Sequence, residues 1–242
     1  MLLSFDVALD AIREHDEWHT REHLPERLSI PGFVRGTRWV ALRGRPRYFV
    51  MYEVEQLATL TSQPYLDRLN NPSPWTSKMM PHYSGMTRGF CGITGSAGSG
   101  IGYVGLLIRF KPAPAKEAAL RQWLLQDRLP KLPRLSGIGS AHLFEAAVTA
   151  KMTTEQRIRG ADAAFDWALL FTGYSEDAVA SLVRSDFGRA RLQRHGALEP
   201  VDAVYRLQYS LTNRELDGEP ARTDMARDCE RSARWPAGRE DM

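Results

Sequence analysis

The chain repeats its own pattern of anchor residues, and this repeat constrains the fold more than any other feature of the sequence. Four anchors recur with a constant spacing of 105 residues, as the pairs Trp18/Trp123, Leu24/Leu129, Pro25/Pro130 and Gly32/Gly137. Self-similarity at a fixed spacing indicates that one structural unit occurs twice. A chain of 242 residues has room for two small units. We therefore expect two halves with the same order of helices and strands.

A second pair of matching segments lies further along the chain at a larger spacing. The apolar runs 48–54 and 167–173 both have strand length, and each precedes a polar turn and a helical pattern. Their spacing of about 119 residues indicates an insertion in the second half, and the polar segment 149–165 is its expected place. Long connections between strands are unusual and often functional. The alternative interpretation of this segment is a mobile surface flap.

Each half follows the order strand, helix, strand, strand, helix, strand. In the first half we expect strands at 2–7, 33–42, 48–55 and 86–94 and helices at 8–24 and 63–70. In the second half we expect strands at 101–110, 138–148, 167–174 and 201–211 and helices at 115–129 and 175–194. The first helix of each half is expected to end at its Leu-Pro step, because proline disfavours the helical conformation of the preceding residue.

Composition indicates the boundaries of these units. The segment 95–100 contains only Gly, Ser and Ala, which is typical of a flexible linker. We therefore expect a first unit over 1–96 and a second unit over 97–212. Residues 213–242 are rich in charge and lack apolar periodicity, so we expect a disordered tail there.

Two βαββαβ units are two ferredoxin-like folds. The sheet of such a unit carries helices on one face only, and its other apolar face must be covered by something else. Two halves of one chain can cover each other by packing sheet against sheet. The expected fold class is therefore α+β, with two ferredoxin-like repeats packed as an intramolecular dimer.

Charge and composition exclude several classes of partner. The chain has 32 Lys and Arg against 29 Asp and Glu, without a basic block of the kind that follows a phosphate backbone, so we expect no nucleic acid. No run approaches the roughly 20 apolar residues that span a bilayer, and the N-terminus lacks the basic region of a secretory signal. Cys91 and Cys229 form neither a disulfide framework nor a metal-binding spacing. We expect a cytoplasmic protein without a membrane partner.

Part of the first half resembles a known family. Trp18, His23, Pro25 and Gly32 resemble the signature of the EthD-like branch of the dimeric α+β barrel superfamily, and the repeat resembles a tandem-fused member. The resemblance implies a ligand cleft between sheet and helices. Relatives include muconolactone isomerases, polyketide cyclases, cofactor-free monooxygenases and, more distantly, haem-binding enzymes. Arg128 stands in the second half where His23 stands in the first, so the resemblance implies a site in the first half.

Three histidines at a spacing of four, His15, His19 and His23, share one face of the first expected helix. After a shift of 105 residues, His15 and His19 correspond to Leu120 and Leu124, which we expect to face the second sheet. A buried imidazole needs a hydrogen-bond partner or water, and histidine exchanges protons near neutral pH. His19 and His23 are therefore the candidate acid–base pair, with His15 as a candidate substrate contact. The alternative is three structural histidines.

Five further side chains are candidates for the same cleft: Tyr52, His82, Arg38, Trp39 and Trp75. Tyr52 could orient a carbonyl or stabilise an enolate, and His82 could reach the cleft from the turn before the fourth strand. We assign both to the catalytic group. Arg38 could bind a substrate carboxylate, and Trp39 and Trp75 could contact the substrate. The alternative for each is a role in packing or on the solvated surface.

Motifs for cofactors are missing from the sequence. It contains no dinucleotide-binding glycine motif, no phosphate-binding loop and no serine nucleophile elbow. His15 and His19 have the i, i+4 spacing of zinc ligands, but neither an HExxH pattern nor a cysteine ligand accompanies them. We therefore expect no cofactor and no metal.

Three functions remain open. The first is a cofactor-independent isomerase, cyclase, lyase or oxygenase that acts on a small aromatic or ring-derived organic acid. The second is a non-catalytic protein for ligand binding or assembly, and the third is a haem-binding member of the superfamily. The expected partners are a small-molecule ligand and a second copy of the fused pair.

Overall fold

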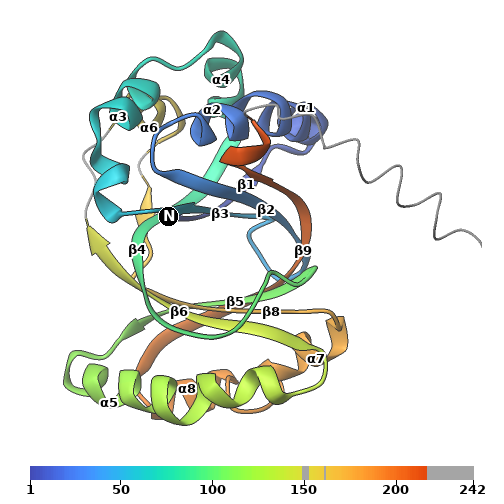
Figure 1. Ribbon diagram of the computed structural model, residues 1–242, viewed down its shortest axis with the longest axis vertical. Coiled ribbons are helices and arrows are strands. Elements are labelled where there is room, and N and C mark those ends of the chain that lie inside the picture. Colours follow the sequence, from blue (N-terminus) through green and yellow to red (C-terminus); the bar gives the residue numbers. More distant parts are fainter. Residues whose placement is uncertain (149–152, 161, 217–242) are drawn as a thin grey trace, which may run out of the picture.

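The computed structural model describes residues 1–148, 153–160 and 162–216. Eight strands form a closed antiparallel barrel in the order β1-β3-β2-β9-β5-β8-β6-β4, and β1 closes the ring by pairing with β4. The strands are β1 (Leu2–Val7), β2 (Phe33–Arg43), β3 (Tyr48–Val54), β4 (Tyr83–Gly98), β5 (Val104–Pro112), β6 (Ile138–Val148), β8 (Trp167–Gly173) and β9 (Ala197–Thr212). Helices cover the barrel in two layers, one above and one below it in Figure 1.

Both halves of the barrel have the same strand order, β4-β1-β3-β2 in the first and β9-β5-β8-β6 in the second. This is the order of a ferredoxin-like sheet. The halves join at both edges, where β2 pairs with β9 and β4 pairs with β6. Because the barrel is closed, the edge strands of both halves are paired. They therefore offer no open edge at which another chain could pair. The expected α+β fold of two ferredoxin-like halves is confirmed, and their bare faces meet as the inner wall of the barrel.

Side chains alternate between the two faces of each strand and so divide the core. On β3, Tyr48, Val50 and Tyr52 pack under the first helix layer, whereas Phe49 and Met51 point into the barrel. The second half has its own helix-layer core. The first sheet therefore has two separate environments, a helix–sheet layer on one face and the barrel interior on the other.

The first helical segment is longer than predicted. It consists of η1 (Leu9–Ala11), α1 (Ile12–Trp18), a π-helical turn η2 (His19–His23) and α2 (Leu24–Leu28). The predicted helix end at Leu24 is wrong. Leu24 donates its N–H to the carbonyl of His19, five residues back, so the widened turn shifts the hydrogen-bond ladder just before Pro25, which has no N–H to supply.

The second half repeats this arrangement. Its elements are η5 (Pro114–Lys116), α5 (Glu117–Gln122), a π-helical turn η6 (Trp123–Arg128) and η7 (Leu129–Arg134). Leu129 donates its N–H to the carbonyl of Leu124, again five residues back and just before a proline. A helical path therefore continues past the Leu-Pro step in both halves, against the prediction.

The remaining helices agree with the predictions in part. In the first half they are η3 (Leu57–Thr61), α3 (Gln63–Asn70), α4 (Pro74–Met79) and η4 (Met80–His82). In the second half they are α7 (Glu176–Ser181), η8 (Leu182–Arg184) and α8 (Arg189–Arg194). The single helix predicted over 175–194 is therefore wrong. The backbone leaves the helical region at Ser185, and Gly188, a poor helix former, caps the next helix.

The linker predicted at 95–100 is largely part of a strand. β4 pairs with β6 as far as Gly98. A Cβ atom on Gly95 would lie 2.1 Å from Leu125 Cδ2, and one on Gly98 would lie 2.1 Å from the carbonyl oxygen of Gly139. These glycines therefore allow close packing of β4 against the second half, and composition alone mistook them for a flexible linker.

The insertion is an ordered part of the fold in the residues that the structure describes. It contains α6 (Thr154–Arg159) and β7 (Ala163–Ala164), and α6 packs against α3 and η4 of the first half (Figure 1). Its Glu155 forms an ion pair with Arg27, and its Asp162 lies 3.0 Å from Arg88; all four side chains are buried. The surface-flap interpretation is therefore wrong for this part.

Two expectations fall partly outside the described residues, namely positions 149–152 and 161 of the insertion and 217–242 of the tail. The start of the tail forms the short turn η9 (Asn213–Glu215). Within the described ranges, every helix is too short or too polar to cross a bilayer.

Candidate functional site

The three helical histidines lie together between the first helical segment and the first sheet. His15 is fully buried, and His19 and His23 are 2% and 9% exposed. Their ring centroids are 5.5 Å apart for His15 and His19 and 5.4 Å apart for His19 and His23. We call these three residues the histidine cluster. The spacing of the histidines and their alignment with Leu120 and Leu124 predicted inward-facing imidazoles, and the burial of all three rings agrees with this prediction.

The cluster occupies the π-helical turn η2 and the turn before it. Single π turns are frequent at functional sites because they re-aim side chains within a helix. The corresponding turn of the second half, η6, carries Leu124, and Leu120 precedes it; both leucines are fully buried in an apolar core. The same backbone feature thus presents imidazoles in one half and leucines in the other.

His15 is held by hydrogen bonds at both ring nitrogens. Its Nε2 lies 3.1 Å from the hydroxyl of Tyr83, and its Nδ1 lies 3.2 Å from Asp16 Oδ1. Burial lowers the pKa of His15. Burial alone would raise the pKa of Asp16, but hydrogen bonds from His15, Gln208 and Tyr48 outweigh it and lower this pKa to about 2. His15 is therefore fixed in position beside a charged carboxylate.

A side chain from the second half completes this network. Gln208 on β9 accepts a hydrogen bond of 2.8 Å from Arg38 Nε and donates one of 2.8 Å to Asp16 Oδ2. The other two nitrogens of Arg38 donate to the carbonyl of Asp16 and to the hydroxyl of Thr20. Arg38 is 3% exposed and lies under the helix. Its three nitrogens thus all contact protein groups, and its charge lies beside the histidine cluster.

Two buried polar atoms near the centre of the cluster have no hydrogen-bond partner in the described part of the chain, Nδ1 of His19 and the hydroxyl of Tyr52. Both residues, together with His23, line a cavity of ≈ 20 Å³ between helix and sheet. A space of this size holds about one water molecule. Burial, reinforced by the charge of Arg38, lowers the pKa of His19 well below 6.5, and burial raises the pKa of Tyr52. At neutral pH His19 is therefore neutral and Tyr52 is protonated.

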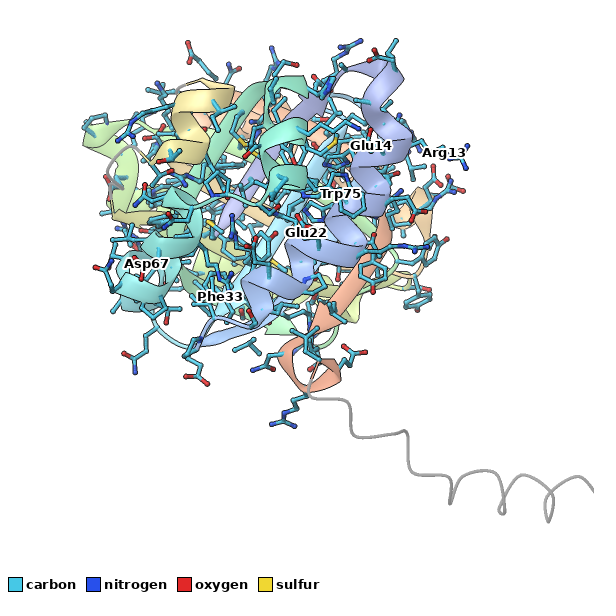
Figure 2. The ribbon with its side chains drawn as sticks, turned by 90° about the horizontal axis from the view of Figure 1, so that it is seen from above. Arg13, Glu14, Glu22, Phe33, Asp67 and Trp75 are labelled. Atoms are coloured by element: carbon cyan, nitrogen blue, oxygen red, sulfur yellow. The ribbon has the colours of Figure 1, made fainter. Side chains whose placement is uncertain are left out.

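Three predicted site residues lie away from the histidine cluster. His82, at the end of η4, is half-exposed and does not line the cavity. Trp75 lies in the outer helix layer, where its Nε1 donates to Glu14 at 3.2 Å (Figure 2). Trp39 is fully buried and faces the barrel interior. The structure thus brings His15, His19, His23, Tyr52 and Arg38 together and separates the other three from them.

A second and larger cavity opens at one mouth of the barrel. Its volume is ≈ 470 Å³, and its walls include Trp39, Met51, Phe144 and His142. This cavity could not be predicted from the sequence, because it forms only when strands of both halves close into one barrel. The only available signal was the alternation along the strand 138–148, which points His142 and Phe144 to the same face.

Neither metal nor haem fits the histidine cluster. Within the described ranges, no three potential metal ligands lie close enough to hold an ion. A haem needs a slot as large as its macrocycle, whereas the cavity here holds about one water molecule. The same layer of the second half is filled by apolar side chains that include Leu120 and Leu124. The arrangement instead offers a neutral imidazole and a protonated phenol around a small cavity.

Comparison with known proteins reveals similarity in structure only. The sequence matches no family profile and no curated protein. Among solved structures, an anthrone oxidase-like protein is 9% identical with a TM-score of 0.63, and the match covers 88% of this chain and 92% of the other. A candidate monooxygenase from Fusobacterium nucleatum subsp. nucleatum is also 9% identical, with a TM-score of 0.54 and coverage of 87% and 92%.

A third similar structure is chlorite dismutase from Candidatus Nitrospira defluvii, at 12% identity, with a TM-score of 0.52 and coverage of 89% and 91%. These TM-scores establish the fold, whereas identities this low leave the activity open. The matches extend over most of both chains, so the similarity includes both halves of the barrel. This chain has the fold of the dimeric α+β barrel proteins.

Proposed function

We propose that this chain is a cytoplasmic small-molecule enzyme that performs cofactor-independent acid–base chemistry in the helix–sheet layer of its first half. The observation that carries the proposal is the pairing of two unpartnered groups, His19 Nδ1 and the Tyr52 hydroxyl, around one closed cavity. Leaving buried polar atoms without partners costs about 1–3 kcal/mol each. A cost of this size is retained in proteins where the groups serve a ligand or a reaction.

His19 and Tyr52 are suited to two different roles in one proton-transfer reaction. The neutral imidazole of His19 would take a proton from a carbon next to a carbonyl group. The Tyr52 hydroxyl would donate a hydrogen bond to the carbonyl oxygen as that oxygen becomes an enolate. His23, on the same cavity wall, would receive this proton from His19 and return it to another atom of the substrate. The substrate class is a small aromatic or ring-derived organic acid, and the fate of the enolate decides between isomerase, cyclase, lyase and oxygenase.

Substrate entry requires that the cavity open, because its present volume holds about one water molecule. Two of its lining residues, Met80 and Met86, are methionines. Their unbranched side chains can adopt several rotamers at low cost. We assign the entrance to this side of the cavity, under η4 and the start of β4.

The same proposal includes the origin of the chain. We infer that it is a tandem fusion within the EthD-like branch and that only the first half keeps ionisable groups under its first helix. The shared strand order and the two π turns before proline support this inference. A further pairing of two fused chains into a homodimer is also part of the proposal.

The test begins with a thermal-shift screen of aromatic and ring-derived carboxylic acids, followed by product analysis of every compound that raises the melting temperature. For a compound that is converted, His19→Ala and His23→Ala should each lower kcat/KM by roughly 10²–10⁴-fold. Tyr52→Phe should lower it by roughly 10²–10³-fold. His195→Ala is the matched control, because His195 lies in the second half, stacked on Trp123.

Full turnover in both histidine variants would contradict the proposal. Binding without conversion of any compound would favour the alternative function, a non-catalytic ligand-binding protein. In that case the same variants should change affinity and produce no kinetic effect.

A further inference from the structure

The cavity at the barrel mouth is not used by the proposed function. Most of it lies on the face of the first sheet opposite to the histidine cluster, where Met51 and Glu53 of β3 line it, and it reaches Tyr52, which also lines the cavity at the cluster. Its volume of ≈ 470 Å³ is in the range of small-molecule sites, whereas the cavity at the cluster is far smaller. The barrel mouth therefore has room for a ligand without any movement of the backbone.

The floor of this cavity is apolar. Trp39 and Leu170 on the floor are 0% and 1% exposed, and Phe144 is 5% exposed. At the rim, Ile93 is left 58% exposed. A flat apolar molecule would lie against the floor residues and remove the exposed surface of Ile93 from water, at a gain of about 25 cal/mol per Å². The cavity thus favours an aromatic ligand.

Two side chains that line this cavity have a ring nitrogen without a hydrogen-bond partner in the described ranges, Trp39 at Nε1 and His142 at Nε2. Nδ1 of His142 lies 2.7 Å from the hydroxyl of Ser96, and Nε2 of His142 has no protein partner in the described ranges. Burial lowers the pKa of His142, so the ring is neutral at pH 7. Depending on the tautomer, Nε2 either donates or accepts one hydrogen bond. A ligand hydroxyl group matches both tautomers, because it can donate and accept.

The charges around the mouth disfavour an anionic ligand. Arg35 is already paired with Glu53 at 3.7 Å, and Glu55 adds a second carboxylate. Met1 lines the same cavity, but its α-amino group donates to the carbonyl of Tyr52 at 2.8 Å, and burial lowers the pKa of this group to about 6, so it is mostly neutral at pH 7. No unpaired cation is therefore available here, within the described ranges, to bind a carboxylate or a sulfonate.

We propose that the barrel mouth is a binding site for a neutral hydroxylated aromatic molecule, whose ring lies against Trp39 and Phe144 and whose hydroxyl group bonds to His142. Tyr52 lines both cavities, but His142, Trp39 and Phe144 lie outside the acid–base centre, so either proposal can fail without the other.

The probe for the test is 2-naphthol, titrated into the full chain by calorimetry at pH 7. We expect one molecule per chain and at least tenfold weaker binding of 2-naphthoate, its charged analogue. His142→Phe should weaken binding of 2-naphthol roughly tenfold, the effect of losing one hydrogen bond of about 1.4 kcal/mol. His195→Phe, which keeps the ring stacked on Trp123, should change it less than twofold.

A second measurement locates the ligand in the unmodified protein, so it does not depend on a variant that folds. Cys91 is half-buried and lines the cavity. Saturating 2-naphthol should slow alkylation of Cys91 by iodoacetamide at least fivefold, as measured by mass spectrometry of its peptide. Absence of saturable binding, or binding that leaves the alkylation rate of Cys91 unchanged, would overturn the proposal. Equal affinity for 2-naphthoate would refute its claim that the ligand is neutral.

Discussion

The buried carboxylate of Glu155 pairs with the buried guanidinium of Arg27, although 128 residues separate them in the sequence. Arg27 lies in α2, one turn after His23, and Glu155 lies in the insertion of the second half. Burial opposes the charge of Arg27, but the attraction of Glu155 outweighs it and raises the pKa of Arg27. The insertion is therefore joined by a buried ion pair to the helical segment that carries the histidine cluster.

Removal of this carboxylate should be strongly destabilising. Glu155→Ala leaves Arg27 buried with Glu26 as its remaining ion-pair partner in the described ranges, so we expect a loss of about 3 kcal/mol in the free energy of unfolding, measured by urea denaturation. Glu17→Ala, which breaks the exposed pair of Glu17 and Arg21, should cost less than about 1 kcal/mol. Equal effects of the two substitutions would mean that the buried pair does not stabilise the fold.

Stability should fall as the pH drops below 6.5. In the folded state His15 and His19 have pKa values below this ordinary value because of burial, so the unfolded chain binds more protons below pH 6.5. Each such histidine makes stability fall by up to about 1.4 kcal/mol per pH unit in this window. The depressed pKa of Asp16, about 2, has its effect only below pH 4. Urea denaturation between pH 7.5 and 5.5 measures the slope, and His19→Phe should reduce it. An unchanged slope in that variant would contradict the assignment.

Much of the fold could be predicted because it depends on local patterns. The spacing of 105 between Trp18 and Trp123 indicated two similar halves, and apolar runs of strand length identified the strands. Two features could not be predicted from local patterns. The π turn before Pro25 overrides the tendency of proline to end a helix, and the glycines of β4 serve close packing against Leu125.

The candidate site was predictable only in the part that lies on one helix. The spacing of the three histidines and their alignment with buried leucines indicated which way the rings face. Gln208 could not be found in this way, because it reaches Asp16 only through the pairing of β2 with β9. The barrel mouth depends on the same closure, since His142 and Trp39 belong to different halves.

Asp16 should act on the cluster through position and not through chemistry. Asp16→Asn keeps the shape of the side chain but removes the charge that holds His15 and Gln208. We expect a loss of about 1.5–3 kcal/mol in the free energy of unfolding, the usual value for hydrogen bonds to a charged group. For a converted substrate, the pH profile of kcat should shift while some activity remains. Asp10→Asn, on the exposed start of the same segment, is the control and should change neither quantity. A complete loss of activity without any loss of stability would instead indicate that Asp16 takes part in the reaction.

The contrast between His19 and Leu124 offers the most direct test of a functional cluster. If His19 is retained for function, its replacement by an apolar residue should stabilise the fold, because Nδ1 is buried without a partner. We expect His19→Leu to raise the free energy of unfolding by about 1 kcal/mol while abolishing conversion of any substrate found. The reverse change, Leu124→His, buries an imidazole in the apolar core of the second half and should cost about 3 kcal/mol or more. Urea denaturation of both variants measures these values. A loss of stability in His19→Leu as large as that in Leu124→His would indicate that His19 is structural.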